Sequence, residues 1–326
     1  MNISKMTNTD INNYLEKIKN GDVDTMYKLG LYYDDQEDYD NMKKYYLMAV
    51  EKGHLGAMNS LAIYYNNQKD HESMKKYFLM AIEKGCVEAM FNLGYYYKNQ
   101  EDYESMKRYF LMAIEKGYVN AMYNLGCYYD EQEDYDNMKK YYLMAVEKGH
   151  LGAMNDLGSY YCDVTSDYEN MKKYYLMAIE KDYTTAMINL GDYYSDRKDY
   201  DNMKKYYLMA IEKGDSDAME HFGMYYNKNR DYENMKKYYL MAIEKGNANA
   251  MTRLISYYKR REYLVEVIKL VQSFGRQLYG TNHVLTKQVT IFEKACTDDI
   301  KIFNMLKKYI EIDDIVFIIR EYYFSL

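Results

Sequence analysis

The sequence contains no proline and no tryptophan, and only four of its 326 residues are cysteine. Proline is the strongest interrupter of helices, so its absence favours a long, largely helical protein. Disulfide frameworks and zinc sites both need closely spaced cysteines. The four cysteines here are scattered, so we expect free thiols in a reducing compartment. They are Cys86, Cys127, Cys162 and Cys296.

Two further absences bear on location and partners. The net charge is −7, whereas a nucleic-acid-binding protein usually has a basic excess. We therefore predict no nucleic-acid partner. The chain has no run of eighteen apolar residues, which predicts no membrane span, and its first ten residues lack the apolar core of a signal peptide. A cytoplasmic protein is expected.

Tyrosine and methionine are present in excess, with 45 and 26 residues. With 48% hydrophobic and 29% charged residues, the chain has the composition of a folded protein and not of a disordered one. One methionine recurs every 32 residues, with a single step of 33 whose extra residue lies between Val164 and Ser166. Such a fixed period is typical of solenoid proteins. These anchor residues are Met26, Met58, Met90, Met122, Met154, Met187, Met219 and Met251.

Glycine follows the same period. Six glycines come four residues after an anchor, as Gly126 does, and six others come 27 residues after one, as Gly149 does. At the first position glycine lets two helices approach closely, and at the second it ends a helix in the left-handed conformation. No phosphate-binding motif accompanies either position. Structural roles are therefore predicted for both.

Each repeat is predicted to form two helices. In the fourth repeat, Met122, Leu125, Gly126 and Tyr129 share one helical stripe, and the polar residues 130–133 are expected to end that helix. Asp134 is a suitable N-cap for a second helix, which should end at Gly149. Two such short helices bury too little surface alone. Stacked copies would bury enough, which predicts an all-α, right-handed α-solenoid of antiparallel helix hairpins.

The repeat resembles the tetratricopeptide repeat and, more specifically, the Sel-one-like repeat (SLR). The resemblance rests on Leu125-Gly126-Cys127-Tyr128-Tyr129, on Ala145-Val146-Glu147-Lys148-Gly149 and on Ala153, and it covers residues from about 22 to 260. It implies a scaffold or adaptor that holds other proteins on a concave surface and has no chemistry of its own. Proline-free versions rich in tyrosine, asparagine and lysine look like those encoded by AT-rich genomes, notably those of giant DNA viruses of amoebae.

We expect three parts in the chain: an N-terminal half-repeat cap over residues 1–21, eight repeats over 22–274 with the eighth degenerate, and a C-terminal helical cap over 275–326. Terminal repeats are usually atypical because one of their faces meets water. A separate functional module is the alternative interpretation of residues 275–326.

Enzyme chemistry is not indicated. The carboxylate pairs lie where helices begin or end, which is typical of capping. The five histidines have no partner four residues away, so we predict no metal site and no cofactor. Some cysteine-rich members of the repeat family are described as β-lactamase-like, but they have a cysteine pair in each repeat, which this chain lacks. The paired tyrosines of every first helix, such as Tyr32 and Tyr33, are expected to pack between repeats.

A binding surface is predicted where the repeats differ from one another. The first helix varies at the positions one, two, five, eight and nine residues after the anchor, and in tetratricopeptide-like solenoids that side lines the concave groove. The groove should be apolar in the first four repeats, then acidic, then basic at Lys228 and Arg253. Drift after duplication is the alternative explanation. The candidate partner-binding residues are Tyr27, Leu31, Asn59, Ile63, Phe91, Tyr95, Tyr123, Asn124, Asp156, Asp192, Glu220 and Lys228.

The second helix carries a leucine and a methionine before its alanine, from Leu47 and Met48 to Leu240 and Met241. These ladders either widen the contact between repeats or leave an apolar strip on the outer surface. We predict a protein-interaction scaffold that binds a peptide or a partner protein in the groove. A self-assembling structural protein that uses the Leu/Met-lined outer face is the alternative.

Overall fold

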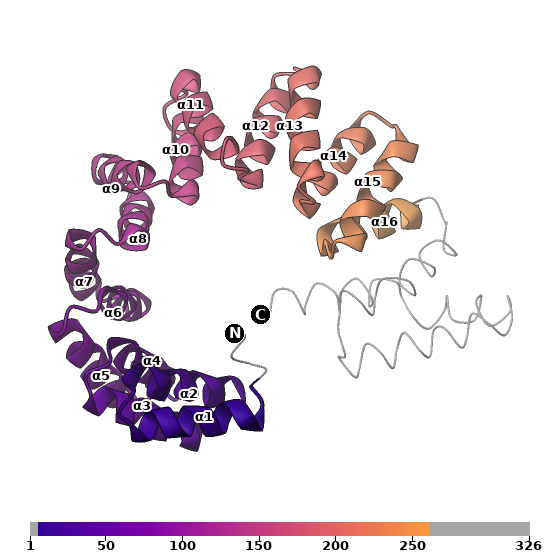
Figure 1. Ribbon diagram of the computed structural model, residues 1–326. Coiled ribbons are helices and arrows are strands. Elements are labelled where there is room, and N and C mark those ends of the chain that lie inside the picture. Colours follow the sequence, from indigo (N-terminus) through magenta and orange to yellow (C-terminus); the bar gives the residue numbers. More distant parts are fainter. Residues whose placement is uncertain (1–5, 261–326) are drawn as a thin grey trace, which may run out of the picture. The chain divides into compact units, whose positions relative to one another are not determined.

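The computed structural model describes residues 6–260, and within that range it contains sixteen helices and no strand (Figure 1). The predicted second helix of the eighth repeat and the predicted cap over 275–326 lie outside the described residues. The helices are α1 (Asn8–Lys19), α2 (Val23–Asp35), α3 (Tyr39–Glu51), α4 (Leu55–Asn67), α5 (His71–Glu83), α6 (Val87–Asn99), α7 (Tyr103–Glu115), α8 (Val119–Glu131), α9 (Tyr135–Glu147), α10 (Leu151–Asp163), α11 (Tyr168–Ile179), α12 (Thr184–Asp196), α13 (Tyr200–Glu212), α14 (Ser216–Lys228), α15 (Tyr232–Glu244) and α16 (Ala248–Arg260).

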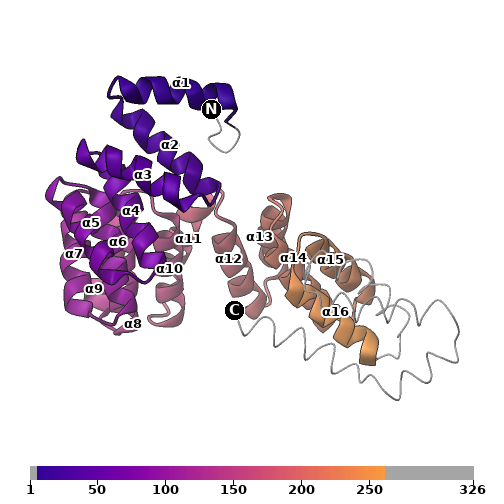
Figure 2. The same ribbon diagram turned by 90° about the horizontal axis from the view of Figure 1, so that it is seen from below.

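Successive helices pack as hairpins, which confirms the predicted all-α solenoid. The chain divides into two compact units, Met1–Met154 and Asn155–Leu326, and the division falls within α10. In the first unit, α4, α6 and α8 lie on the inner side of an arc, whereas α5, α7 and α9 lie on its outer side (Figure 1). Figure 2 shows α1 at the end of this unit, next to α2. In the second unit, α14 and α16 lie on one side and α13 and α15 on the other (Figure 1).

The N-terminal helix α1 packs on the first repeat through Ile18, which is buried in the same apolar cluster as Met26. This helix begins at a capping box between Thr7 and Asp10, so its start is fixed locally. The division into cap, repeats and C-terminal cap remains a prediction.

Each described second helix begins at an aspartate, as predicted for Asp134. The Asp134 carboxylate accepts two hydrogen bonds from Asn137, one from the backbone N–H at 3.2 Å and one from the side-chain amide at 2.7 Å. These bonds lower the pKa of Asp134. The first helix of this repeat ends at Glu131, one residue beyond Asp130, where the polar turn was expected to begin.

The two glycine positions have the predicted roles. Gly149 has φ +84°, and a Cβ added there would meet no atom within 4 Å. A Cβ on Gly126 would lie 2.7 Å from Cε1 of Tyr142, so the two helices of the hairpin need glycine at this contact. Two further left-handed residues were not predicted: Glu133 in the hairpin turn has φ 56°, and Asp182 has φ 62° where other repeats have glycine.

Side chains of both helices form the core of each repeat. Met122, Leu125, Met138 and Tyr142 are buried in the fourth repeat. The tyrosine at position seven stacks on a tyrosine of the second helix, as Tyr129 does on Tyr141, with ring centroids 5.6 Å apart and planes at 4°. These tyrosine pairs pack between helices, as expected, but many of the position-seven rings are only half-buried.

Candidate functional site

The apolar part of the predicted groove lies on the first helices of the first unit. Tyr27 and Leu31 come from α2, Ile63 from α4, and Phe91 and Tyr95 from α6. Tyr95 is 47% exposed and Ile63 is 41% exposed, while the other three are half-buried. Large apolar side chains are therefore available to a partner from two neighbouring repeats.

Aromatic neighbours hold Phe91 in place beside Tyr95. The Phe91 ring lies 5.5 Å from the buried Phe110 ring of α7 and 5.2 Å from the Tyr118 ring that precedes α8. Its centroid is 6.3 Å from that of Tyr95. Aromatic pairs at these distances are favourable beyond their buried area. Phe91 therefore belongs partly to the core, and Tyr95 is the more accessible ring.

Histidines that cap first helices support two other predicted aromatic residues. Tyr27 lies 4.4 Å from the ring of His54, and Tyr123 lies 4.3 Å from the ring of His150. The Nδ1 atom of His54 accepts the backbone N–H of Ala57 at 3.1 Å and so caps α4. This arrangement fixes the tyrosine rings on the first-helix face.

Some residues at the variable positions pair across repeats, an arrangement that was not predicted. At four junctions between repeats the residue one after an anchor contacts the residue two after the next anchor. Asn92 donates to Oδ1 of Asn59 at 3.0 Å, and Asn189 donates to Oδ1 of Asn155 at 2.9 Å. The hydroxyls of Tyr27 and Ser60 lie 3.4 Å apart. Comparing these two positions between successive repeats, and not each position alone, could have revealed the pairing.

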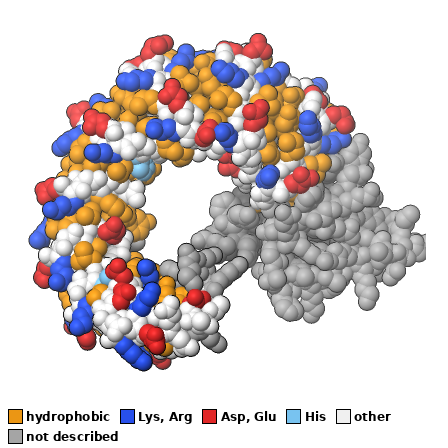
Figure 3. Space-filling view, viewed as in Figure 1, with side chains coloured by type: hydrophobic (Ala, Val, Ile, Leu, Met, Phe, Trp, Pro, Cys, Tyr) orange, Lys and Arg blue, Asp and Glu red, His pale blue; other side chains and the backbone are white. Residues whose placement is uncertain are grey.

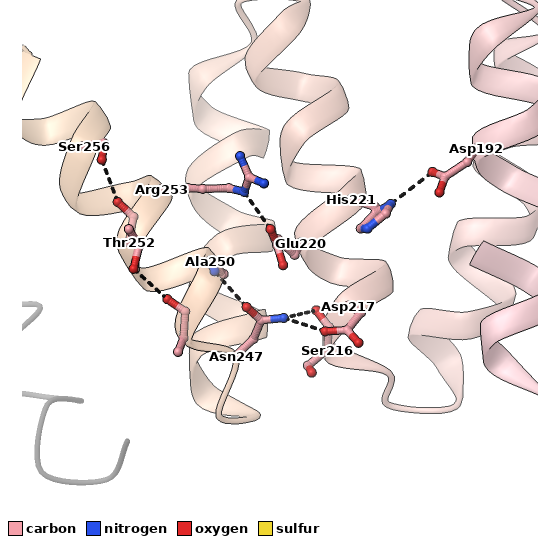
Figure 4. Close-up of polar contacts among 11 residues, drawn as sticks. Asp192, Ser216, Asp217, Glu220, His221, Asn247, Ala250, Thr252, Arg253 and Ser256 are labelled. Atoms are coloured by element: carbon pink, nitrogen blue, oxygen red, sulfur yellow. Dashed lines mark hydrogen bonds and ion pairs between the residues drawn. The ribbon is translucent and has the colours of Figure 1, made fainter. Parts of the chain in front are cut away.

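The same rule joins two charged residues in the second unit. Nε of Arg253 donates to Oε1 of Glu220 at 2.6 Å (Figure 4). Glu220 is only 5% exposed, so its carboxylate serves the contact between α14 and α16 and is not open to a partner. The predicted change from acidic to basic character therefore includes a neutralised pair.

Asp192 is the centre of a second polar cluster in this unit. Its carboxylate accepts hydrogen bonds from Nδ1 of His221, at 3.0 Å, and from the hydroxyl of Tyr207. The bond to Asp192 raises the pKa of His221, while burial is the main cause that raises the pKa of Tyr207. Figure 4 shows His221 between Asp192 and the Glu220–Arg253 pair.

A cavity of about 320 Å³ adjoins this cluster and brings predicted residues together. Asp192 and Lys228 line it, together with His221 and Arg253. Arg253 also lines a neighbouring cavity of about 730 Å³, with Thr252 of α16. This cavity lies in the second unit, where the polar end of the groove is predicted, and the groove itself stays a prediction.

The remaining two predicted residues have local partners. The side-chain amide of Asn124 donates to the backbone oxygen of Asn120 at 2.8 Å. Asp156 accepts from the amide of Asn155 at 3.2 Å. Nothing in these contacts indicates a ligand.

In residues 6–260 no group of three or more His, Cys, Asp or Glu side chains is placed to hold a metal ion. No helix in that range is both long enough and apolar enough to cross a membrane.

A comparison with known protein families identifies four of the repeats. Four segments match the tetratricopeptide repeat: residues 23–51, 87–115, 119–147 and 184–212. Each segment begins and ends with one hairpin, namely α2–α3, α6–α7, α8–α9 and α12–α13. No curated protein sequence matches the chain.

Solved structures share the fold. A Sel1 repeat protein from Oxalobacter formigenes aligns with a TM-score of 0.52 and 21% identity, over 66% of this chain and 98% of the other. Yeast Tom70 aligns with a TM-score of 0.52 and 15% identity, over 85% and 66%. A human IFIT1 dimer with PPP-AAAA aligns with a TM-score of 0.51 and 14% identity, over 85% and 73%. The viral origin suggested by composition is not supported by these matches.

Proposed function

We propose that this chain, an α-solenoid of tetratricopeptide-like, Sel1-type repeats, is a scaffold that holds a peptide or partner protein on the first-helix face. Solenoids of these families generally act as protein-interaction scaffolds and not as enzymes. The observation that carries the proposal is the exposure of Tyr95 and Ile63 on the first helices of successive repeats, with the half-buried ring of Phe91 beside Tyr95.

The apolar residues of the first unit would anchor the partner. Exposed tyrosine is common among the residues that dominate binding energy, because it buries a large area with few rotatable bonds. Phe91 and the histidine-supported rings of Tyr27 and Tyr123 hold the surface in one arrangement. A preformed surface reduces the entropy lost on binding.

The polar cavity of the second unit would give specificity. Lys228 and the half-exposed Arg253 offer hydrogen-bond donors, and Asp192 offers an acceptor that is already engaged by His221. We expect this cavity to bind polar side chains of the partner. The partner's identity and the cytoplasmic location remain predictions.

Affinity capture with matched variants tests the proposal. The purified chain, the Tyr95→Ala variant and the Tyr103→Ala variant are immobilised, and the proteins they retain from a cell lysate are compared by quantitative mass spectrometry. Tyr103 is also an exposed tyrosine, but it lies on the second helix α7. A protein retained by the wild type and by Tyr103→Ala, but lost with Tyr95→Ala, supports the groove. Retention that is equal for all three rejects it.

A further inference from the structure

The outward stripe of each second helix has the same order of side chains in the first unit. A basic residue comes three positions before the ladder leucine, and a glutamate comes four positions after it. In α5 these are Lys76, Leu79 and Glu83, and all three are exposed. Spacings of three and four residues place them on one face of the helix.

The ladder leucines of the first unit are exposed, whereas the adjacent methionines are half-buried. Leu79 and Leu111 are 42% and 41% exposed, and Leu47 and Leu143 are each 37% exposed. Met80 packs against the core of the unit. The methionines therefore pack toward the core, and the leucines form an exposed apolar strip on the outer surface.

Charged rows flank this strip on both sides. The basic row consists of Lys44, Lys76, Arg108 and Lys140, and the acidic row consists of Glu51, Glu83, Glu115 and Glu147. Lys76 lies over the ring of Tyr77 and Arg108 over the ring of Tyr109, and neither forms an ion pair with another described residue. The space-filling view shows both charges alternating with hydrophobic side chains along the outer edge of this unit (Figure 3).

We propose that the outer face of the first unit binds a second copy of this chain, with the paired second helices antiparallel. A two-fold axis through the leucine row would place the basic row of each copy opposite the acidic row of the other. A parallel arrangement would place Lys76 opposite Lys76 and Glu83 opposite Glu83, which like-charge repulsion opposes. The face is complementary to itself, as an isologous interface requires.

The curvature of the unit limits the contact to neighbouring repeats near its middle. The second helices lie on the outer side of the arc, so two such convex faces meet only where they come closest to each other (Figure 1). The helices α5 and α7 carry the two most exposed leucines of the ladder, Leu79 and Leu111. These two residues from each copy form the centre of the interface.

The proposed dimer leaves the first-helix face free, because that face lies on the other side of each hairpin. Ile63 and Tyr95 project from α4 and α6, not from the second helices. Two copies would then present two grooves, and a partner with two binding segments would be held by both. This inference does not depend on the proposed groove.

Sedimentation velocity of the full chain, at concentrations up to about 100 µM, tests the interface. We expect the wild type to dimerise and the Leu79→Lys/Leu111→Lys variant to be monomeric with an unchanged helical circular dichroism spectrum. Ile63→Lys/Tyr95→Lys is the matched control, since it adds the same two charges at exposed positions of the first helices α4 and α6; it should dimerise like the wild type.

A charge exchange gives a test that does not depend on the leucine variant folding. The Lys76→Glu/Arg108→Glu variant has an acidic face, and the Glu83→Lys/Glu115→Lys variant has a basic one. Each alone should be monomeric, and an equimolar mixture should form a heterodimer. A monomeric wild type at every concentration, a dimer that the leucine substitutions leave intact, or a mixture that does not associate would each overturn the proposal.

Discussion

Arg253 of α16 donates from Nε to the buried Oε1 of Glu220 on α14, and it thereby joins the first helices of two successive repeats. The contact occupies the same pair of repeat positions as Asn59 with Asn92 and Asn155 with Asn189. In these three pairs the two residues that differ between repeats are chemically matched to each other.

Removing the arginine should destabilise the second unit. Arg253→Ala leaves the carboxylate of Glu220 buried without its partner, and we expect a loss of about 1–3 kcal/mol in the free energy of unfolding. The double variant Arg253→Ala/Glu220→Gln should recover part of that loss, because no charge is then left unpaired. Urea unfolding followed by circular dichroism measures both. Equal stability of Arg253→Ala and the wild type contradicts the structural role.

The pair of His221 and Asp192 should make stability depend on pH. The hydrogen bond to Asp192 raises the pKa of His221 above its unfolded value of about 6.5. Its contribution is therefore fully present below pH 6.5 and is lost as pH rises through the folded pKa. The melting temperature of the wild type, relative to that of His221→Gln, should fall as pH rises from about 6 to about 8. A constant difference would show that the pair is not linked to protonation.

The glycine of the first helix should not tolerate a side chain. Gly126→Ala places a Cβ against the Tyr142 ring, and we expect a cost of about 1–3 kcal/mol from overpacking; Gly126→Leu should cost at least as much. Tyr95→Ala, at an exposed position of the preceding repeat, should change the melting temperature far less. If both Gly126 variants have the same melting temperature as the wild type, the two helices do not need this close approach.

Asp182 offers a test of the left-handed positions. It has φ 62° where six other repeats have glycine, and side chains other than glycine pay for that conformation. We expect Asp182→Gly to stabilise the chain by up to about 1 kcal/mol and Gly149→Asp to destabilise it. Chemical unfolding of the two variants checks the opposite signs. The same sign for both would show that other contacts decide stability there.

The features that depend only on residues within one repeat were predicted from the sequence. The period, the aspartate caps and the close approach at Gly126 all follow from residues that recur in one register. The pairing of Glu220 with Arg253 did not follow, because it joins different positions of two repeats 33 residues apart. Leu79 and Met80 lie side by side in the sequence, and only the direction in which hairpins stack decides which of them is covered. The left-handed Glu133 was missed because glutamate gives no local signal for that conformation.

The affinity of a captured partner for the Tyr95→Ala variant tests the groove most directly. Isothermal titration of one partner protein against the wild type, Tyr95→Ala and Tyr103→Ala gives three dissociation constants. An anchor residue at the centre of the groove should contribute about 2 kcal/mol, so Tyr95→Ala should bind roughly 30-fold more weakly while Tyr103→Ala binds like the wild type. A dissociation constant for Tyr95→Ala within about threefold of the wild-type value would contradict the assignment of the first-helix face as the partner-binding surface.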